Sequence, residues 1–179
     1  MSESTSGGLW CFSLECYGHQ PVEDICLQLQ DRYALNVNVM LCCCWLGFSG
    51  RGQVAKRALQ DAIDAIALWH DRIVLPLRVA RRTAKAATPD RAFSALYKEL
   101  LRSEVAAEHV EQLLLELTLR GIKPCGRTTA QQRRRDARRN LAIGVRLLGA
   151  SSDSPLHRDL DALVETIAAL QSRSGRAAG

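Results

Sequence analysis

Apolar side chains recur three or four positions apart along most of this chain, which is the spacing of one buried helix face. A clear example is the segment 22–33, whose apolar residues are Val22, Ile25, Cys26, Leu29 and Tyr33. Only 5 of the 179 residues are proline, and runs of β-branched or aromatic residues are scarce, so the composition also favours helix over strand. The sequence therefore predicts an all-α protein, a single-domain bundle of about six to eight helices.

Capping and turn residues divide this pattern into segments. Helices are expected over 9–17, from Pro21 to 33, from an Asn36 or Asn38 cap to Phe48, over 53–87, from Thr88-Pro89-Asp90 to Leu119, from Thr128 or Thr129 to Leu148, and over 156–170. Pro76 must kink or split the long 53–87 segment, because a proline inside a helix removes a hydrogen bond and clashes with the preceding turn. The helix that ends at Phe48 is apolar nearly all round, so we expect it at the centre.

The termini and the cysteines complete the expected organisation. Residues 1–8 are expected to be a disordered N-terminus, 9–171 the single domain and 172–179 a disordered tail. Six of the seven cysteines sit at apolar positions inside expected helices, which is typical of reduced core thiols. Their spacing lacks the paired C-x2-C units of a zinc site, so we expect no metal and no cofactor.

The chain carries no segment that predicts a membrane span or a secretory signal. Its longest apolar run, Val37–Phe48, is well short of the roughly 20 residues that a membrane helix requires. The first eight residues lack a positive stretch followed by an apolar one. We therefore expect a cytoplasmic protein without a membrane partner.

Charge is distributed unevenly along the sequence. Residues 1 to 50 carry one basic and five acidic side chains, whereas residues 120 to 148 carry nine basic and one acidic. Such polarisation indicates an anionic partner surface or an acidic patch of a second copy. It leaves the oligomeric state open.

Two arginine-rich segments are the candidate binding surfaces. Four cations share one helix face just after Pro76, at positions i, i+3, i+4 and i+7, and they are Arg78, Arg81, Arg82 and Lys85. Arginine there can bind a phosphate or carboxylate, or the cations can pair with Glu104 or Glu108 on a neighbouring helix. The segment 133–139, which contains Arg134 and Arg138, can neutralise nucleic-acid phosphates, although the chain offers no aromatic platform for stacking bases.

A polar group near the junction of the second and third helices is the alternative site. Its members are Gln28, Asp31, Asn36, Asn38 and Trp45. Helix capping accounts for part of this group, and a small polar pocket is the other interpretation. The series Glu104, Glu108 and Glu111 does not have the repeated Glu-x-x-His spacing of a di-iron bundle. No complete catalytic arrangement is present, and no catalytic residue is assigned.

Several ordered motifs resemble those of an uncharacterised bacterial family. These motifs are Leu9-Trp10-Cys11-Phe12-Ser13-Leu14 with Tyr17, Cys26-Leu27-Gln28-Leu29-Gln30-Asp31, Asn36-Val37-Asn38, Trp45, Trp69 and Pro76-Leu77-Arg78. Between Leu9 and Gly121 the chain resembles the DUF2390 proteins, whose function is unknown. The resemblance implies a bacterial, cytoplasmic, helical protein and no particular mechanism.

Our leading hypothesis from the sequence is a non-enzymatic helical binding or adaptor module. It would contact a protein or another anionic partner through the Arg78 to Lys85 face. One alternative is a small-molecule-binding protein or enzyme with its site near Asn36, Asn38 and Asp31. The other is a nucleic-acid-associated factor.

Overall fold

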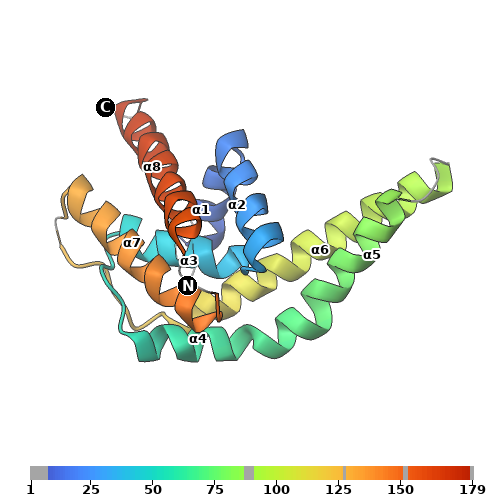
Figure 1. Cartoon of the computed structure of the whole chain (residues 1–179), viewed down its shortest axis with the longest axis horizontal. Coiled ribbons are helices and arrows are strands. Elements are labelled where there is room, and N and C mark those ends of the chain that lie inside the picture. Colours follow the sequence, from blue (N-terminus) through green and yellow to red (C-terminus); the bar gives the residue numbers. More distant parts are fainter. Residues whose placement is uncertain (1–7, 87–90, 127, 151–152, 178–179) are drawn as a thin grey trace, which may run out of the picture.

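The computed structural model describes residues 8–86, 91–126, 128–150 and 153–177, and all its regular elements are helices (Figure 1). They are α1 (Leu9–Tyr17), α2 (Gln20–Tyr33), α3 (Val37–Phe48), α4 (Lys56–Trp69), the π-helical turn η1 (His70–Val74), α5 (Leu75–Ala86), α6 (Arg91–Thr118), α7 (Ala130–Leu147) and α8 (Ser154–Ala177). Because α4, η1 and α5 form one continuous helix, the described residues contain seven helices and no strand. The predicted all-α class is confirmed.

Helix α3 is the centre of the fold. Every residue from Asn38 to Phe48 is buried, and α3 contacts α1, α2, α6 and α7. The helix begins where the side-chain oxygen of Asn36 accepts hydrogen bonds from the backbone N–H groups of Asn38 and Val39, at 2.9 and 3.3 Å. It ends before Gly50, whose φ of +75° suits glycine. The predicted central helix is thus confirmed, with Asn36 as its cap.

The long helix from α4 to α5 is kinked, as the sequence predicts, and the distortion is located in η1. Pro76 is the second residue after η1 and has no N–H for the preceding turn. A π-helical turn at this point adds a residue to the helix and lets the chain pass the proline without breaking. Beyond the kink, α5 and α6 lie side by side and form an arm that extends away from the other helices (Figure 1).

The helix boundaries agree with the sequence patterns over most of the described chain. At the C-terminal end, α8 runs from Ser154 to Ala177 and so includes residues 172–177, which the sequence assigned to a disordered tail. The side chain of Thr129 caps α7 by accepting a hydrogen bond from the N–H of Gln132. The expected helix start at Thr88-Pro89-Asp90 lies outside the described residues, as do residues 1–7 of the expected disordered N-terminus.

The cysteines are unbridged thiols, in agreement with the sequence prediction. Cys125 is exposed and Cys11 is half-buried, whereas the other five are buried in α1, α2 and α3. Burial raises the pKa of Cys43 to about 12 and is also the largest cause of the same rise in Cys16 and Cys26. Within the described ranges, no group of three or more His, Cys, Asp or Glu side chains can hold a metal ion. None of the described helices is both long enough and apolar enough to cross a membrane.

Candidate functional site

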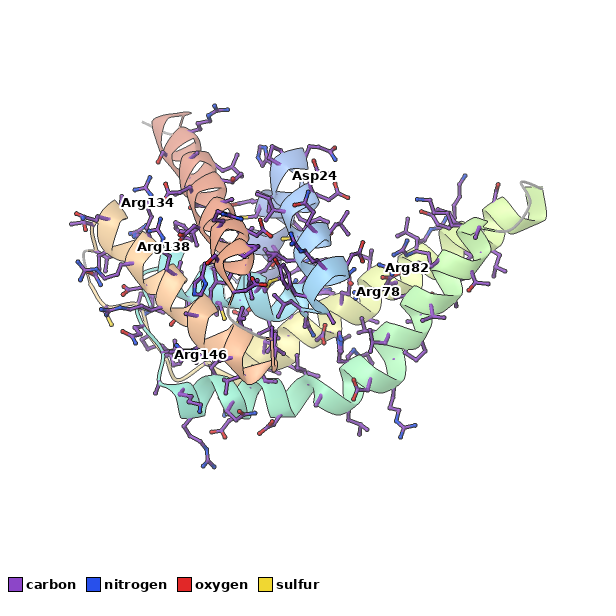
Figure 2. All side chains as sticks on the ribbon, in the orientation of Figure 1. Asp24, Arg78, Arg82, Arg134, Arg138 and Arg146 are labelled. Carbon is purple, nitrogen blue, oxygen red and sulfur yellow. The ribbon has the colours of Figure 1, made fainter. Side chains whose placement is uncertain are left out.

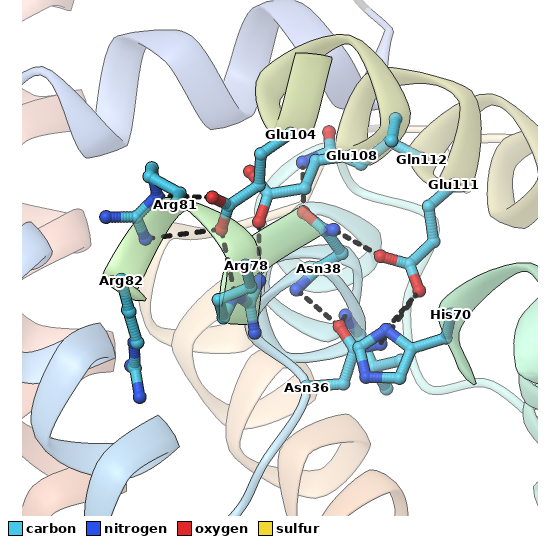
Figure 3. A network of polar contacts seen from close by, with 12 residues as sticks. Asn36, Asn38, His70, Arg78, Arg81, Arg82, Glu104, Glu108, Glu111 and Gln112 are labelled. Carbon is cyan, nitrogen blue, oxygen red and sulfur yellow. Dashed lines mark hydrogen bonds and ion pairs between the residues drawn. The ribbon is translucent and has the colours of Figure 1, made fainter. Parts of the chain in front are cut away.

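Two of the four predicted cations on α5 are held by carboxylates of α6 (Figure 3). The Nε of Arg78 donates to Oε1 of Glu104 at 2.9 Å, and its Nη2 donates to Oε1 of Glu108 at 2.6 Å. Arg81 also binds Glu104 through its Nε. The side chains of Arg78 and Glu104 are 11% and 5% exposed, so this is a nearly buried ion-pair cluster. The pairing with Glu104 and Glu108, which the sequence left as an alternative, is therefore confirmed for Arg78 and Arg81.

The two glutamates of this cluster have pKa values that move in opposite directions. Burial pushes the pKa of Glu104 up, but the hydrogen bonds and charges of Arg81 and Arg78 outweigh it and hold the pKa below its usual value. For Glu108 burial dominates and raises the pKa, with smaller rises from the neighbouring Glu104 and Glu111 charges. Glu104 is therefore the carboxylate that most strongly attaches α5 to α6.

The other two predicted cations of α5 face solvent. The Nη2 of Arg82 donates to Oδ1 of Asp31 on α2 at 2.8 Å, and both side chains are more than half exposed. Lys85 is exposed and forms no ion pair within the described part of the chain. Leu75 and Val79 are exposed on the same helix, and Val79 is 64% exposed. The outer surface of α5 is therefore both cationic and apolar.

The arginines of α7 are also paired within the chain. Arg138 lies between α7 and α8, where it donates to Oδ1 of Asp161 at 2.8 Å and to Oε1 of Glu165 at 2.6 Å. Arg134 lies 3.4 Å from the other oxygen of Glu165. These contacts place the two predicted arginines along the α7–α8 seam (Figure 2). Acidic residues of α8 already offset the positive charge that a nucleic acid would need there.

Asn36 and Asn38 form a buried polar cluster with residues of α6 and η1 (Figure 3). The carboxylate of Glu111, which is fully buried, accepts hydrogen bonds from the Nδ2 atoms of Asn36 and Asn38 at 2.9 and 2.5 Å. His70 Nδ1 lies 2.8 Å from Oε1 of Glu111, and Gln112 donates to the side-chain oxygen of Asn38 at 2.8 Å. The hydrogen-bonding groups of the two asparagines are thus used to join α3, α6 and η1.

The remaining members of the alternative site lie elsewhere. Gln28 and Asp31 line a wide, open groove of about 630 Å³, and its other lining residues are Asp24, Leu27, Arg32 and Asp159. Trp45 is buried in α3, and the guanidinium of Arg51 lies 4.0 Å from the centre of its ring. The structure therefore brings Asn36 and Asn38 together but separates them from the solvent-facing Gln28 and Asp31.

An apolar surface lies on α6, away from α5. Its exposed large side chains are Leu101, Val105, Val110, Leu113 and Leu117. Trp10 of α1 stacks on His109 with ring centres 4.3 Å apart, beside a shallow groove of about 410 Å³. The exposed Leu14 follows one turn further along α1. We call these residues together the α6 outer face.

Comparison with known proteins assigns the chain to a family. Residues 8–115 match the family described as "Protein of unknown function (DUF2390)". The chain belongs to the DUF2390 family. No curated protein and no solved structure matches it.

The DUF2390 match covers most of the sites described above and excludes others. Asn36, Asn38 and Glu111 of the buried polar cluster fall inside the matched segment, and so do Arg78 and Glu104 of the arm. The seam between α7 and α8, which contains Arg134 and Arg138, lies beyond residue 115. The arm and the buried cluster are therefore features of the DUF2390 segment itself.

Sequence reasoning missed two features of this DUF2390 protein. It did not connect Glu111 and Gln112 with the asparagine caps, because contacts between distant helices leave no periodic signal. It also missed the α6 outer face. The signal for that face was present, since the 28-residue α6 carries leucine or valine on more than one side.

Proposed function

We propose that this DUF2390 protein is a non-enzymatic binding module that docks an anionic protein partner along the outer surface of α5. One observation carries the proposal: α5 has no buried residue, and it exposes Leu75 and Val79 beside Arg82 and Lys85. The arm presents this helix away from the core of the fold (Figure 1). This proposal keeps the sequence hypothesis of a basic contact face and narrows it to the cations that face solvent.

The spacing of these side chains places them on one surface of α5, which a groove on a partner protein can bind. Leu75, Val79 and Arg82 follow one another at i, i+4 and i+7, so they form one stripe along α5. An apolar stripe of this kind packs into a partner's hydrophobic groove, and acidic residues at the rim of that groove would meet Arg82 and Lys85. The partner therefore has an apolar groove with carboxylates at its edge.

The existing contact of Arg82 does not prevent such docking. Both Arg82 and Asp31 are more than half exposed, and exposed ion pairs contribute only about 0 to 1 kcal/mol. A partner carboxylate can replace Asp31 at little cost. Arg78 and Arg81 have a different role in this proposal, because their buried pairs with Glu104 attach the presenting helix to α6.

A pull-down from lysate of the native cell tests the proposal. The double variant Arg82→Glu/Lys85→Glu should lose the partners that the wild-type protein recovers, as identified by mass spectrometry. The matched control is Lys56→Glu/Arg57→Glu, which makes the same charge change at exposed positions of α4 and should recover the wild-type set. Circular dichroism should show equal helicity for all three proteins.

Two results would contradict the proposal. Recovery of unchanged partners by the Arg82→Glu/Lys85→Glu variant would show that the outer surface of α5 is not the contact. Loss of all partners after nuclease treatment of the lysate, together with retention on heparin that falls steeply with salt, would favour a nucleic-acid ligand instead.

A further inference from the structure

A pocket of about 320 Å³ lies between the start of α7 and the C-terminal half of α8, and most of its lining lies beyond the DUF2390 match. Phe48 at the end of α3 and Ala168 of α8 contribute apolar lining. The polar lining residues are Thr128, Arg133, Arg134, Gln171 and Ser172. This volume is at the lower end of the range for small-molecule sites, about 300 to 1,000 Å³. The pocket is therefore large enough for a small ligand.

Arg133 is the unusual member of this lining, because it forms no ion pair with any described residue. Four other half-buried arginines each contact a carboxylate, and they are Arg78, Arg81, Arg134 and Arg138. Arg133 instead donates from Nε to Oγ1 of Thr128 at 2.9 Å, and this bond orients its guanidinium group. A half-buried cation is stabilised by a nearby opposite charge. The chain supplies none to Arg133, so an anionic ligand can.

Arg134 adds a second cation whose charge is only partly matched. Its Nε is buried, makes no hydrogen bond within the described residues, and lies 3.4 Å from Oε2 of Glu165. Glu165 has a closer partner, since its Oε1 accepts from Arg138 at 2.6 Å. None of the described lining residues is acidic. The two guanidinium groups can therefore bind an oxyanion in the pocket together.

The neutral groups of the pocket are donors that suit the same ligand. The hydroxyl of Thr128 accepts from Arg133 and leaves its own proton available to donate. The side-chain amide of Gln171 lines the pocket and has no hydrogen-bond partner among the described residues. Ala130 is the first residue of α7, where backbone N–H groups have no acceptor within the helix and the helix dipole favours an anion. Charged and neutral donors thus meet at one pocket.

We propose that this pocket binds the phosphate group of a small phosphate monoester. Such a group carries a charge of about −1.5 to −2 at pH 7 and three acceptor oxygens. Two guanidinium groups, a hydroxyl, an amide and the start of a helix match it. A carboxylate has one charge and two oxygens, so it would leave more of these donors unused. The pocket lies on α7 and α8, away from the outer surface of α5, so the proposal is independent of the docking function proposed above.

Isothermal titration calorimetry of the whole chain with inorganic phosphate and with glycerol 3-phosphate tests the proposal. Both compounds should bind at one site, and glycerol alone should give no saturable heat. Arg133→Gln should weaken the binding of both about tenfold or more, the usual effect of losing hydrogen bonds to a charged group. The matched control is Arg135→Gln, which makes the same charge change at an exposed position of α7 outside the pocket and should bind like the wild-type protein.

Nuclear magnetic resonance locates the bound compound. Glycerol 3-phosphate should shift the backbone N–H signal of Ala130 and the side-chain amide signals of Gln171, and Arg133→Gln should remove these shifts. Absence of saturable binding, or equal weakening by Arg133→Gln and Arg135→Gln, would overturn the proposal. Tighter binding of a single-stranded oligonucleotide without terminal phosphates, with a steep dependence on salt, would also overturn it in favour of a nucleic-acid backbone.

Discussion

At the scale of single residues, Gly47 sets how closely α3 and α7 approach each other. A Cβ atom at position 47 would lie 2.4 Å from the backbone nitrogen and 2.6 Å from the Cα of Ala137. Gly144 is a second close approach, since a Cβ there would lie 3.0 Å from the sulfur of Cys43. The obstacle at Gly47 is backbone, so it cannot move aside as a flexible side chain can. Glycine at 47 is therefore required for the central packing.

We expect Gly47→Ala to destabilise the protein by about 3 kcal/mol, because it forces two close-packed helices apart. Gly121→Ala is the matched control. A Cβ at Gly121 meets nothing within 4 Å, so this change should alter the free energy of unfolding by less than about 0.5 kcal/mol. Urea unfolding followed by circular dichroism measures both. Equal stability of the two variants would contradict this account of the α3–α7 contact.

Single residues also show where sequence reasoning reached its limit at the candidate site. The cap at Asn36 could be predicted, because capping is a local contact between neighbours in the sequence. The convergence of Asn36 and Asn38 on Glu111 could not, since these residues are more than seventy positions apart and meet only after α3 and α6 pack. Local patterns therefore located the polar residues but not their partners.

At the scale of elements, the arm depends on the contact between α5 and α6. Helix α5 has no buried residue, so apolar burial contributes little to its attachment. The nearly buried ion pairs of Arg78 and Arg81 with Glu104 supply the attachment that apolar burial does not. Removing one member of a buried ion pair leaves the other charge without its partner, which costs about 3 to 5 kcal/mol. Replacing Glu104 should therefore weaken the contact between α5 and α6 more than any other change at this contact.

We expect Glu104→Gln to lower the free energy of unfolding at pH 7 by about 3 kcal/mol relative to the wild-type protein. Because the pKa of Glu104 in the folded protein lies below its usual value, the stability that it contributes is present above the unfolded pKa of about 4.3. That contribution is lost as the pH falls further, through the folded pKa. The difference in the free energy of unfolding between the wild-type protein and the Glu104→Gln variant should therefore shrink as the pH is lowered from 5 to 3 (roughly the range around that unfolded pKa).

Urea titrations at a series of pH values measure this difference. Glu108, whose pKa burial raises, is present in both proteins, so the comparison reports mainly on Glu104. The control is Glu99→Gln, an exposed glutamate of the same helix, which should change stability by less than about 0.5 kcal/mol at any pH. A Glu104→Gln effect that is constant with pH would show that the charge of Glu104 is not what attaches α5.

At the scale of the whole molecule, the sequence predicted the helices better than their assembly. Apolar spacing and caps located α1, α2, α3 and the kink near Pro76, because these depend on nearby residues. The sequence separates charge into an acidic and a basic segment, but folding pairs part of that charge with other helices. Asp31 of the acidic segment pairs with Arg82 of α5, and Arg138 of the basic segment pairs with Asp161 of α8, so each segment is partly neutralised by a helix outside the other. Which helices meet is determined by packing, and periodicity does not encode it.

The buried cysteines allow the cooperativity of this assembly to be measured. Cys16, Cys26 and Cys44 come from α1, α2 and α3 and lie in one hydrophobic core. Burial blocks access to them and also raises their pKa values, so the reactive thiolate is scarce in the folded protein. If the core unfolds as one unit, thiols on all three helices should become reactive together.

We therefore expect iodoacetamide to label the exposed Cys125 in the native protein and to leave the buried thiols unmodified. As urea is increased, labelling of Cys16, Cys26 and Cys44, resolved by peptide mass spectrometry, should rise with one midpoint that coincides with the loss of helicity. The Cys125→Ser variant supplies the control, because any rapid labelling of its native form should be confined to the half-buried Cys11. Earlier labelling of Cys16 or Cys26 than of Cys44 would mean that α1 and α2 open separately, and the N-terminal helices would then be a less stable layer over α3 rather than part of one cooperative core.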